Sequence, residues 1–112
     1  MSLFDNAPRQ RWPRSQHFRL TEKGIEAEAQ YREMIAAARD GQGRFSYDAA
    51  RAAWALPLKL EPSDGLCLGE LQTEPRTLPE IVLALEPCGS TKQEVRAAVE
   101  RLVDGGFLDL VV

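Results

Sequence analysis

Two stretches near the C-terminus have the clearest helical pattern in the chain. In the first, apolar residues recur at i, i+3, i+4 and i+7, the spacing of one helix face: Leu78, Ile81, Val82 and Leu85. The second repeats this spacing over a longer span: Val95, Ala98, Val99, Leu102 and Val103. A Pro-Cys-Gly segment at 87–89 separates them, which predicts two short helices joined by a tight break.

Both helices have recognisable start signals. In a capping box, a Ser or Thr at the N-cap and a Glu or Gln three residues later each bond the other's backbone N–H. Thr77 and Glu80 form this pair for the first helix, with Pro79 in the first turn, where its missing N–H costs nothing. Two pairs fit the second helix: Ser90 with Gln93, or Thr91 with Glu94. The glycines at 105–106 predict its end, and residues 107–112 then predict a strand.

The upstream half begins with a strand and a long helix. Polar and apolar residues alternate over 16–21, which predicts a short half-buried strand. Thr21 then caps a helix over 22–39, and the segment 40–43 (Asp-Gly-Gln-Gly) stops it. Apolar residues form one face of this helix: Ala27, Tyr31, Met34, Ile35 and Ala38.

Two further helices are predicted between residues 46 and 72. The first starts at a Ser46 cap, runs to Leu56 and is ended by Pro57. Its apolar side consists of Tyr47, Ala50 and Trp54. The second spans about 63–72, although two glycines weaken it, and its inward residues are Leu66, Cys67 and Leu71.

These elements predict a mostly α fold with a small β component. Residues 1–15 are rich in proline and arginine, which predicts a flexible basic arm. Residues 16–62 form an N-terminal strand and helical extension, and residues 63–112 form a three-helix unit closed by a strand. Together they amount to a single compact domain, since 112 residues suffice for one core.

The C-terminal unit resembles the winged-helix superfamily. The stretch from Thr77 to Leu85, followed by Ser90 to Leu108, is similar to helices two and three of such a domain leading into its first wing strand. The resemblance covers about 50 residues, 63–112, and implies a winged-helix-like three-helix core with a helix-turn-helix. Short helices need such a shared core, because they are not stable alone in water.

Residues 18–24 (Phe-Arg-Leu-Thr-Glu-Lys-Gly) are similar to another part of this superfamily. In many bacterial winged-helix regulators, the wing leads through such a segment into a C-terminal helix. Here the segment precedes the helix-turn-helix instead of following it. Either residues 16–40 form a dimerisation or docking extension, or the similarity is coincidental.

Catalytic and metal chemistry are not expected, and no cofactor is implied. His17 is the only histidine and reads as a surface or strand-edge imidazole. Cys67 and Cys88 lack metal-ligand spacing and are expected to be reduced thiols in the core or in a turn. The glycines at 41 and 43 fit a helix stop better than a phosphate loop. No apolar run is long enough to span a bilayer and no signal peptide is evident, so we expect a cytoplasmic, non-enzymatic protein without membrane contact.

The winged-helix resemblance implies DNA as a partner and transcription regulation as a role. In that superfamily the third helix enters the major groove, which points here to Thr91, Lys92, Gln93 and Arg96, with Arg101 beside them. The basic arm could follow the phosphate backbone or enter a minor groove through Arg9, Arg11, Arg14 and Arg19. A homodimer through the helix at 22–39 is the expected assembly.

The charge distribution counts against DNA and leaves an alternative partner open. Four arginines against one aspartate give residues 1–19 a net charge of +3, whereas four basic against ten acidic residues give 61–112 a net charge of −6. An acidic reading unit is a handicap for DNA, because phosphate neutralisation supplies most non-specific affinity. The alternative is a protein-interaction or peptide-binding module that does not bind DNA. Trp12 and Trp54 suit interfaces, although core packing also explains them, above all for Trp54.

Overall fold

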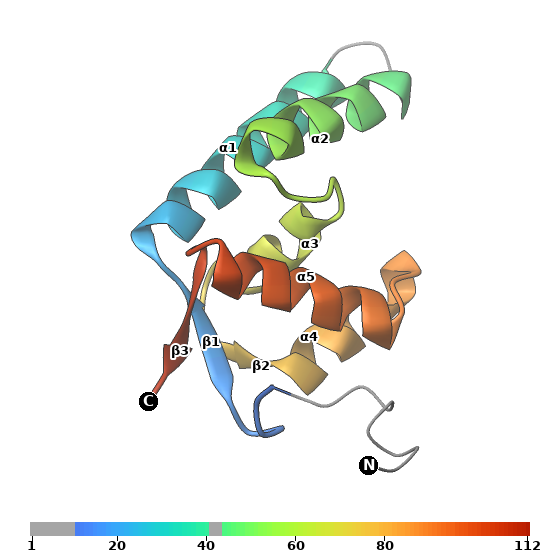
Figure 1. The fold of residues 1–112 in the computed structure, drawn as a ribbon. Coiled ribbons are helices and arrows are strands. Elements are labelled where there is room, and N and C mark those ends of the chain that lie inside the picture. The colour runs from blue at the N-terminus through green and yellow to red at the C-terminus, as the bar shows by residue number, and fades with distance from the viewer. Residues whose placement is uncertain (1–10, 41–43) are drawn as a thin grey trace, which may run out of the picture.

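The strand nearest the N-terminus lies at the centre of the only sheet formed by the described residues. The computed structural model describes residues 11–40 and 44–112. Its elements follow one another in this order: β1 (His17–Leu20), α1 (Glu22–Arg39), α2 (Arg44–Leu58), α3 (Asp64–Glu70), β2 (Arg76–Thr77), α4 (Leu78–Leu85), a 3-10 turn (Glu86–Cys88), α5 (Lys92–Asp104) and β3 (Leu108–Val111). The predicted mostly helical fold with a small β component is thus confirmed (Figure 1).

The sheet has the order β2-β1-β3, with both pairings antiparallel. His17 lies opposite Thr77 on one side and opposite Val111 on the other. Because side chains alternate along a strand, Phe18 and Leu20 point to the core while His17 and Arg19 face outward. β1 thereby joins the N-terminal segment to the last strand of the chain.

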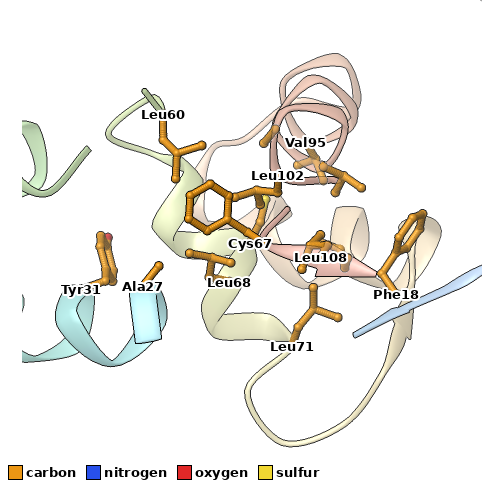
Figure 2. Close-up of a cluster of buried hydrophobic side chains, with 14 of the residues drawn as sticks. Phe18, Ala27, Tyr31, Leu60, Cys67, Leu68, Leu71, Val95, Leu102 and Leu108 are labelled. Carbon is orange, nitrogen blue, oxygen red and sulfur yellow. The ribbon is translucent and has the colours of Figure 1, made fainter. Parts of the chain in front are cut away.

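The core lies between this sheet and helices α3, α4 and α5. Figure 2 shows side chains from β1, α3, α5 and β3 converging on one cluster. The largest fully buried members come from four elements and from the segment between α5 and β3: Phe18, Leu68, Ile81, Leu102 and Phe107. The apolar faces predicted for α4 and α5 supply its buried residues on those two helices, which explains why such short helices are stable here.

Helices α1 and α2 form an antiparallel hairpin that extends away from this core (Figure 1). Tyr31 and Trp54 meet edge to face, with their ring centroids 4.9 Å apart. The indole N–H of Trp54 donates to the Ala27 carbonyl at 2.9 Å, so the core position expected for Trp54 is confirmed. Two glycines bring the hairpin close to the body, with Gly24 against the Phe107 carbonyl and Gly65 against the Tyr31 ring.

The predicted helix starts at Thr21, Thr77 and Thr91 are confirmed. Thr77 and Glu80 form a complete capping box, in which the Thr77 N–H donates to the Glu80 carboxylate at 2.8 Å. This hydrogen bond holds the pKa of Glu80 below its usual value. Of the two pairs open for α5, Thr91 with Glu94 forms the box, and Ser90 lies outside the helix.

The bounds predicted for α2 are wrong at both ends. The helix begins at Arg44, two residues before the predicted Ser46 cap, and continues through Pro57 to Leu58. Pro57 lies in the last turn, which is closed by the Lys59 and Leu60 N–H groups on the Leu56 and Ala55 carbonyls. Lys59 adopts the left-handed conformation that glycine usually supplies there, with φ of 58°.

The remaining differences are small. The strands at 17–20 and 108–111 are shorter than the predicted 16–21 and 107–112, and α3 spans 64–70 in place of 63–72. The predicted basic arm at 1–15 and the predicted stop at 40–43 fall largely on residues 1–10 and 41–43, which lie outside the described part of the chain.

Candidate binding surface

The solvent side of α5 is divided between basic and acidic residues. Lys92 and Gln93 are exposed in the first turn, and Arg96 is half-buried one turn later. The Thr91 hydroxyl accepts the Glu94 N–H at 3.1 Å, so this predicted contact residue serves as the helix cap. By helical periodicity, Glu100 and Asp104 continue the solvent side toward the C-terminal end of α5. The two cations Lys92 and Arg96 are therefore confined to the first half of the predicted DNA-reading helix, where the exposed Glu94 offsets one of them.

The arm binds the other end of α5 through Arg11. Its guanidinium donates to both carboxylate oxygens of Asp104, at 3.1 and 3.2 Å, and lies 4.6 Å from the centre of the Trp12 ring. Trp12 in turn meets Phe18 edge to face, with centroids 4.9 Å apart. The pair is solvent-exposed, so its contribution to the free energy of unfolding is small. Its main effect is to place the arm against the body.

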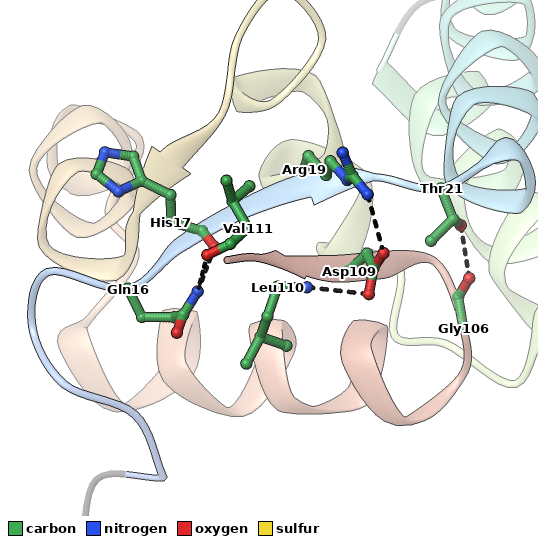
Figure 3. A network of polar contacts seen from close by, with 8 residues as sticks. All are labelled: Gln16, His17, Arg19, Thr21, Gly106, Asp109, Leu110 and Val111. Atoms are coloured by element: carbon green, nitrogen blue, oxygen red, sulfur yellow. Dashed lines mark hydrogen bonds and ion pairs between the residues drawn. The ribbon is translucent and has the colours of Figure 1, made fainter.

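Arg19 is also paired, on the outer face of the sheet. Its guanidinium lies 3.4 Å from the carboxylate of Asp109 on the neighbouring strand β3 (Figure 3). The Gln16 side-chain amide donates to the Val111 carbonyl at 2.9 Å, at the start of the same strand pair. Arg11 and Arg19 thus lie at different places on the molecule, each beside a carboxylate, and Arg9 falls outside the described residues.

The structure brings together Arg14 and Lys92, two predicted site residues from separate segments of the chain. Both line a groove of about 290 Å³ beside α4. The other lining residues are four apolar side chains and one carboxylate: Leu78, Pro79, Val82, Leu83 and Glu86. Leu83 is 71% exposed, and the sequence pattern gave it no role. The groove is thus an apolar floor with two cations and one anion among its lining residues.

Arg101 does not contribute to this surface, although it was expected beside the reading residues. Its guanidinium donates two hydrogen bonds to Asp64 of α3, at 3.0 and 2.8 Å. Asp64 is completely buried, and the hydrogen bonds to it raise the pKa of Arg101 above its usual value. Asp64 also accepts the Glu61 N–H at 2.9 Å. The two residues are 37 positions apart, so no local sequence signal could have paired them.

The remaining reactive groups stay apart. The Cys67 thiol is buried in the core, and burial raises its pKa to about 12, while Cys88 is exposed in the turn after α4. Both are free thiols, as expected. His17 is exposed on the sheet, with its Nδ1 3.0 Å from the Ser15 carbonyl oxygen. Across residues 11–40 and 44–112, no three His, Cys, Asp or Glu side chains gather as a metal site.

In the same described ranges, no helix has the length and apolar character needed to cross a bilayer. No family model, curated protein or solved structure matches the chain. What the chain does must therefore be inferred from its own geometry.

Proposed function

We propose that this chain is a non-enzymatic, winged-helix-like module that binds a protein segment in the groove beside α4. One observation carries the proposal: a groove with an apolar floor formed by α4 is lined by two cations from other segments, Arg14 from the arm and Lys92 from α5. A partner helix or strand with apolar residues and carboxylates has the matching chemistry.

The composition of α4 supports this role. Glu80 is its only charged residue, and its buried side, Ile81 and Leu85, accounts for only part of its apolar surface. Val82 packs partly against the core and also lines the groove, whereas Leu83 is exposed beside it. A helix that is apolar on nearly all sides is normally covered on all sides, which favours a partner over this face.

The size of the groove favours side chains over a free small molecule. Its volume of about 290 Å³ is at the lower end of the range of roughly 300–1,000 Å³ typical for small-molecule pockets. Lys92 and Arg14 attract carboxylates, whereas Glu86 repels them at its own position. We therefore infer that the partner's acidic residues lie beside the two cations and its apolar residues on Val82 and Leu83.

The winged-helix reading is supported by the pairing of two segments that separately resemble wing strands. Residues 18–20 lie antiparallel to residues 108–110, and Thr21 leads directly into α1. In this chain the strand comes from the N-terminal part of the sequence. In the regulators that the sequence resembles, the corresponding strand follows the third helix. This relation also favours residues 16–40 as an integral part of the fold over a coincidental similarity.

Double-stranded DNA is the second candidate partner. Lys92, Gln93 and Arg96 lie together at the N-terminal end of α5, where the helix dipole adds positive potential. Glu100 and Asp104 lie further along the helix, and Arg11, Arg19 and Arg101 each contact a carboxylate. These contacts reduce the positive charge available to phosphates, so we rank DNA below a protein segment.

Fluorescence anisotropy with two labelled probes separates the candidates. One probe is a short helical peptide with leucine at i, i+3, i+4 and i+7 and glutamate elsewhere, and the other is a duplex DNA. We expect the peptide to bind, and Leu83→Asn and Lys92→Glu to weaken it at least several-fold. Ile25→Asn, at an exposed site on α1, is the matched control and should leave the affinity unchanged.

The DNA reading predicts a different pattern. Lys92→Glu should then weaken DNA binding and reduce its salt dependence, whereas Leu83→Asn should have no effect, because phosphates do not need an apolar surface. Tight DNA binding that Leu83→Asn leaves intact, together with no peptide binding, contradicts the groove proposal. Backbone amide shifts on peptide addition should centre on α4 and the start of α5, and shifts elsewhere would count equally against it.

A further inference from the structure

The outer face of α2 is apolar and uncovered. Four residues spaced i, i+3, i+4 and i+7 form one exposed stripe: Ala49, Ala52, Ala53 and Leu56. Leu56 is 80% exposed, the largest exposure of any leucine among the described residues. The opposite side of the helix packs on α1 through Trp54. Both sides of α2 are therefore apolar, although the described part of the chain covers only one.

The outer face of α1 differs in character. Its exposed residues are mainly charged, among them Glu22, Glu26, Arg32 and Glu33, and Ile25 is its one large exposed apolar side chain. A homodimer through residues 22–39, the assembly expected from the sequence, would have to bring these charges together. The apolar stripe makes α2 the better surface for self-association.

We infer that a second copy of this chain packs on α2, antiparallel, with a two-fold axis between residues 52 and 53. About this axis Ala52 lies opposite Ala53 of the second copy, and Ala49 lies opposite Leu56 of the second copy. Small residues at the centre let the two helices approach closely, and each leucine fits over an alanine. The stripe is thus complementary to itself under the symmetry that most homodimers adopt.

The charges at the two ends of the stripe select the antiparallel direction. Asp48, whose carboxylate lies 3.8 Å from the Arg51 guanidinium of its own helix, is exposed at the N-terminal end, and Lys59 is exposed just beyond the C-terminal end. An antiparallel copy places Asp48 near Lys59 of the second copy, whereas a parallel copy would place like charges together. Since one helix face buries less than roughly 1,200 Å² of total surface, we expect a reversible dimer of about micromolar dissociation constant.

Sedimentation equilibrium over a concentration series tests the inference on the full chain. The wild type should change from monomer to dimer, and Leu56→Lys should remain monomeric at every concentration. Ile25→Lys, a matched change at an exposed residue of α1, should dimerise like the wild type. Circular dichroism of all three proteins checks that each is folded. A wild type that stays monomeric, or a dimer that Leu56→Lys leaves intact, overturns the inference.

Cysteine cross-linking tests the direction of packing. In a Cys88→Ser background, which removes the exposed native thiol, chains with Ala49→Cys are mixed with chains with Leu56→Cys. We expect mild oxidation to give a disulfide dimer in the mixture and little in either variant alone. Preferential cross-linking of each variant with itself indicates a parallel dimer and overturns the two-fold axis proposed above. Neither outcome bears on the groove beside α4, which lies on other elements.

Discussion

At the scale of single residues, Asp64 and Arg101 form an ion pair whose carboxylate is completely buried. Asp64 has no exposed surface, whereas the Arg101 side chain is 38% exposed. The two partners therefore differ in what happens when the other is removed. Arg101 can turn toward water, but Asp64 would remain buried with an uncompensated charge.

This asymmetry gives a prediction. Arg101→Met should lower the free energy of unfolding by about 3 kcal/mol, since it leaves the Asp64 carboxylate buried and unpaired. Asp64→Asn should cost less, about 1–2 kcal/mol, because the amide oxygen can still accept the Glu61 N–H. Combining both changes should cost less than Arg101→Met alone. Urea unfolding of the four proteins measures these differences, and a larger cost for Asp64→Asn would show that the pair is not organised in this way.

Residue-scale contacts were also the hardest to predict. The sequence identified Arg14 and Lys92 as site residues but on separate elements, and it left Leu83 without a role. Their proximity depends on where the segment before β1 lies on the body, and Arg11 helps to fix this through its contact with Asp104, 93 positions along the chain. Such long-range pairings have no periodic or local signature.

At the scale of elements, helix starts were predictable and helix ends less so. A capping box needs two residues three positions apart, so Thr77 with Glu80 is visible in the sequence. The end of α2 is not, because Lys59 takes a left-handed conformation that its side chain does not favour. Local rules therefore predicted α4 and α5 well, and α2 only in its middle.

Two glycines in helices should respond in opposite ways to alanine. At Gly24 of α1 an added methyl group would overlap the Phe107 carbonyl oxygen, so Gly24→Ala should cost about 1–3 kcal/mol of unfolding free energy. At Gly69 of α3 no heavy atom lies within 4 Å of the added carbon, and Gly69→Ala should stabilise the protein by about 0.5–1 kcal/mol. Thermal unfolding followed by circular dichroism distinguishes them. Equal effects at the two sites would mean that α1 does not approach Phe107 closely.

At the scale of the whole molecule, one sheet joins the two ends of the described chain. The unit predicted at 63–112 contains β2 and β3, but these strands pair only through β1, which precedes it. β1 also contributes Phe18, which is fully buried. The unit predicted at 63–112 is therefore incomplete without residues 17–20.

A fragment of residues 63–112 should consequently fail to fold cooperatively. A circular permutant that joins Val112 to Gln16 through a glycine-serine linker, and opens between residues 62 and 63, should fold, because His17 already lies opposite Val111. Amide proton dispersion in NMR spectra compares the two. A well-dispersed spectrum from the isolated fragment would show that β1 is dispensable.

The same central strand affects how the protein is made. On the ribosome, β1 is synthesised long before β3, since Arg19 and its partner Asp109 are 90 positions apart. The α1–α2 hairpin depends on contacts close in sequence and can form early, but Phe18 and Leu20 must wait for the last strand. A nascent chain interrupted before residue 108 can pair β1 with β2 but keeps the other edge of β1 unpaired, and exposed strand edges are the kind of surface that chaperones and proteases recognise. Incomplete copies should therefore be removed by cellular quality control, whereas full-length copies pair this strand with β3 when they fold.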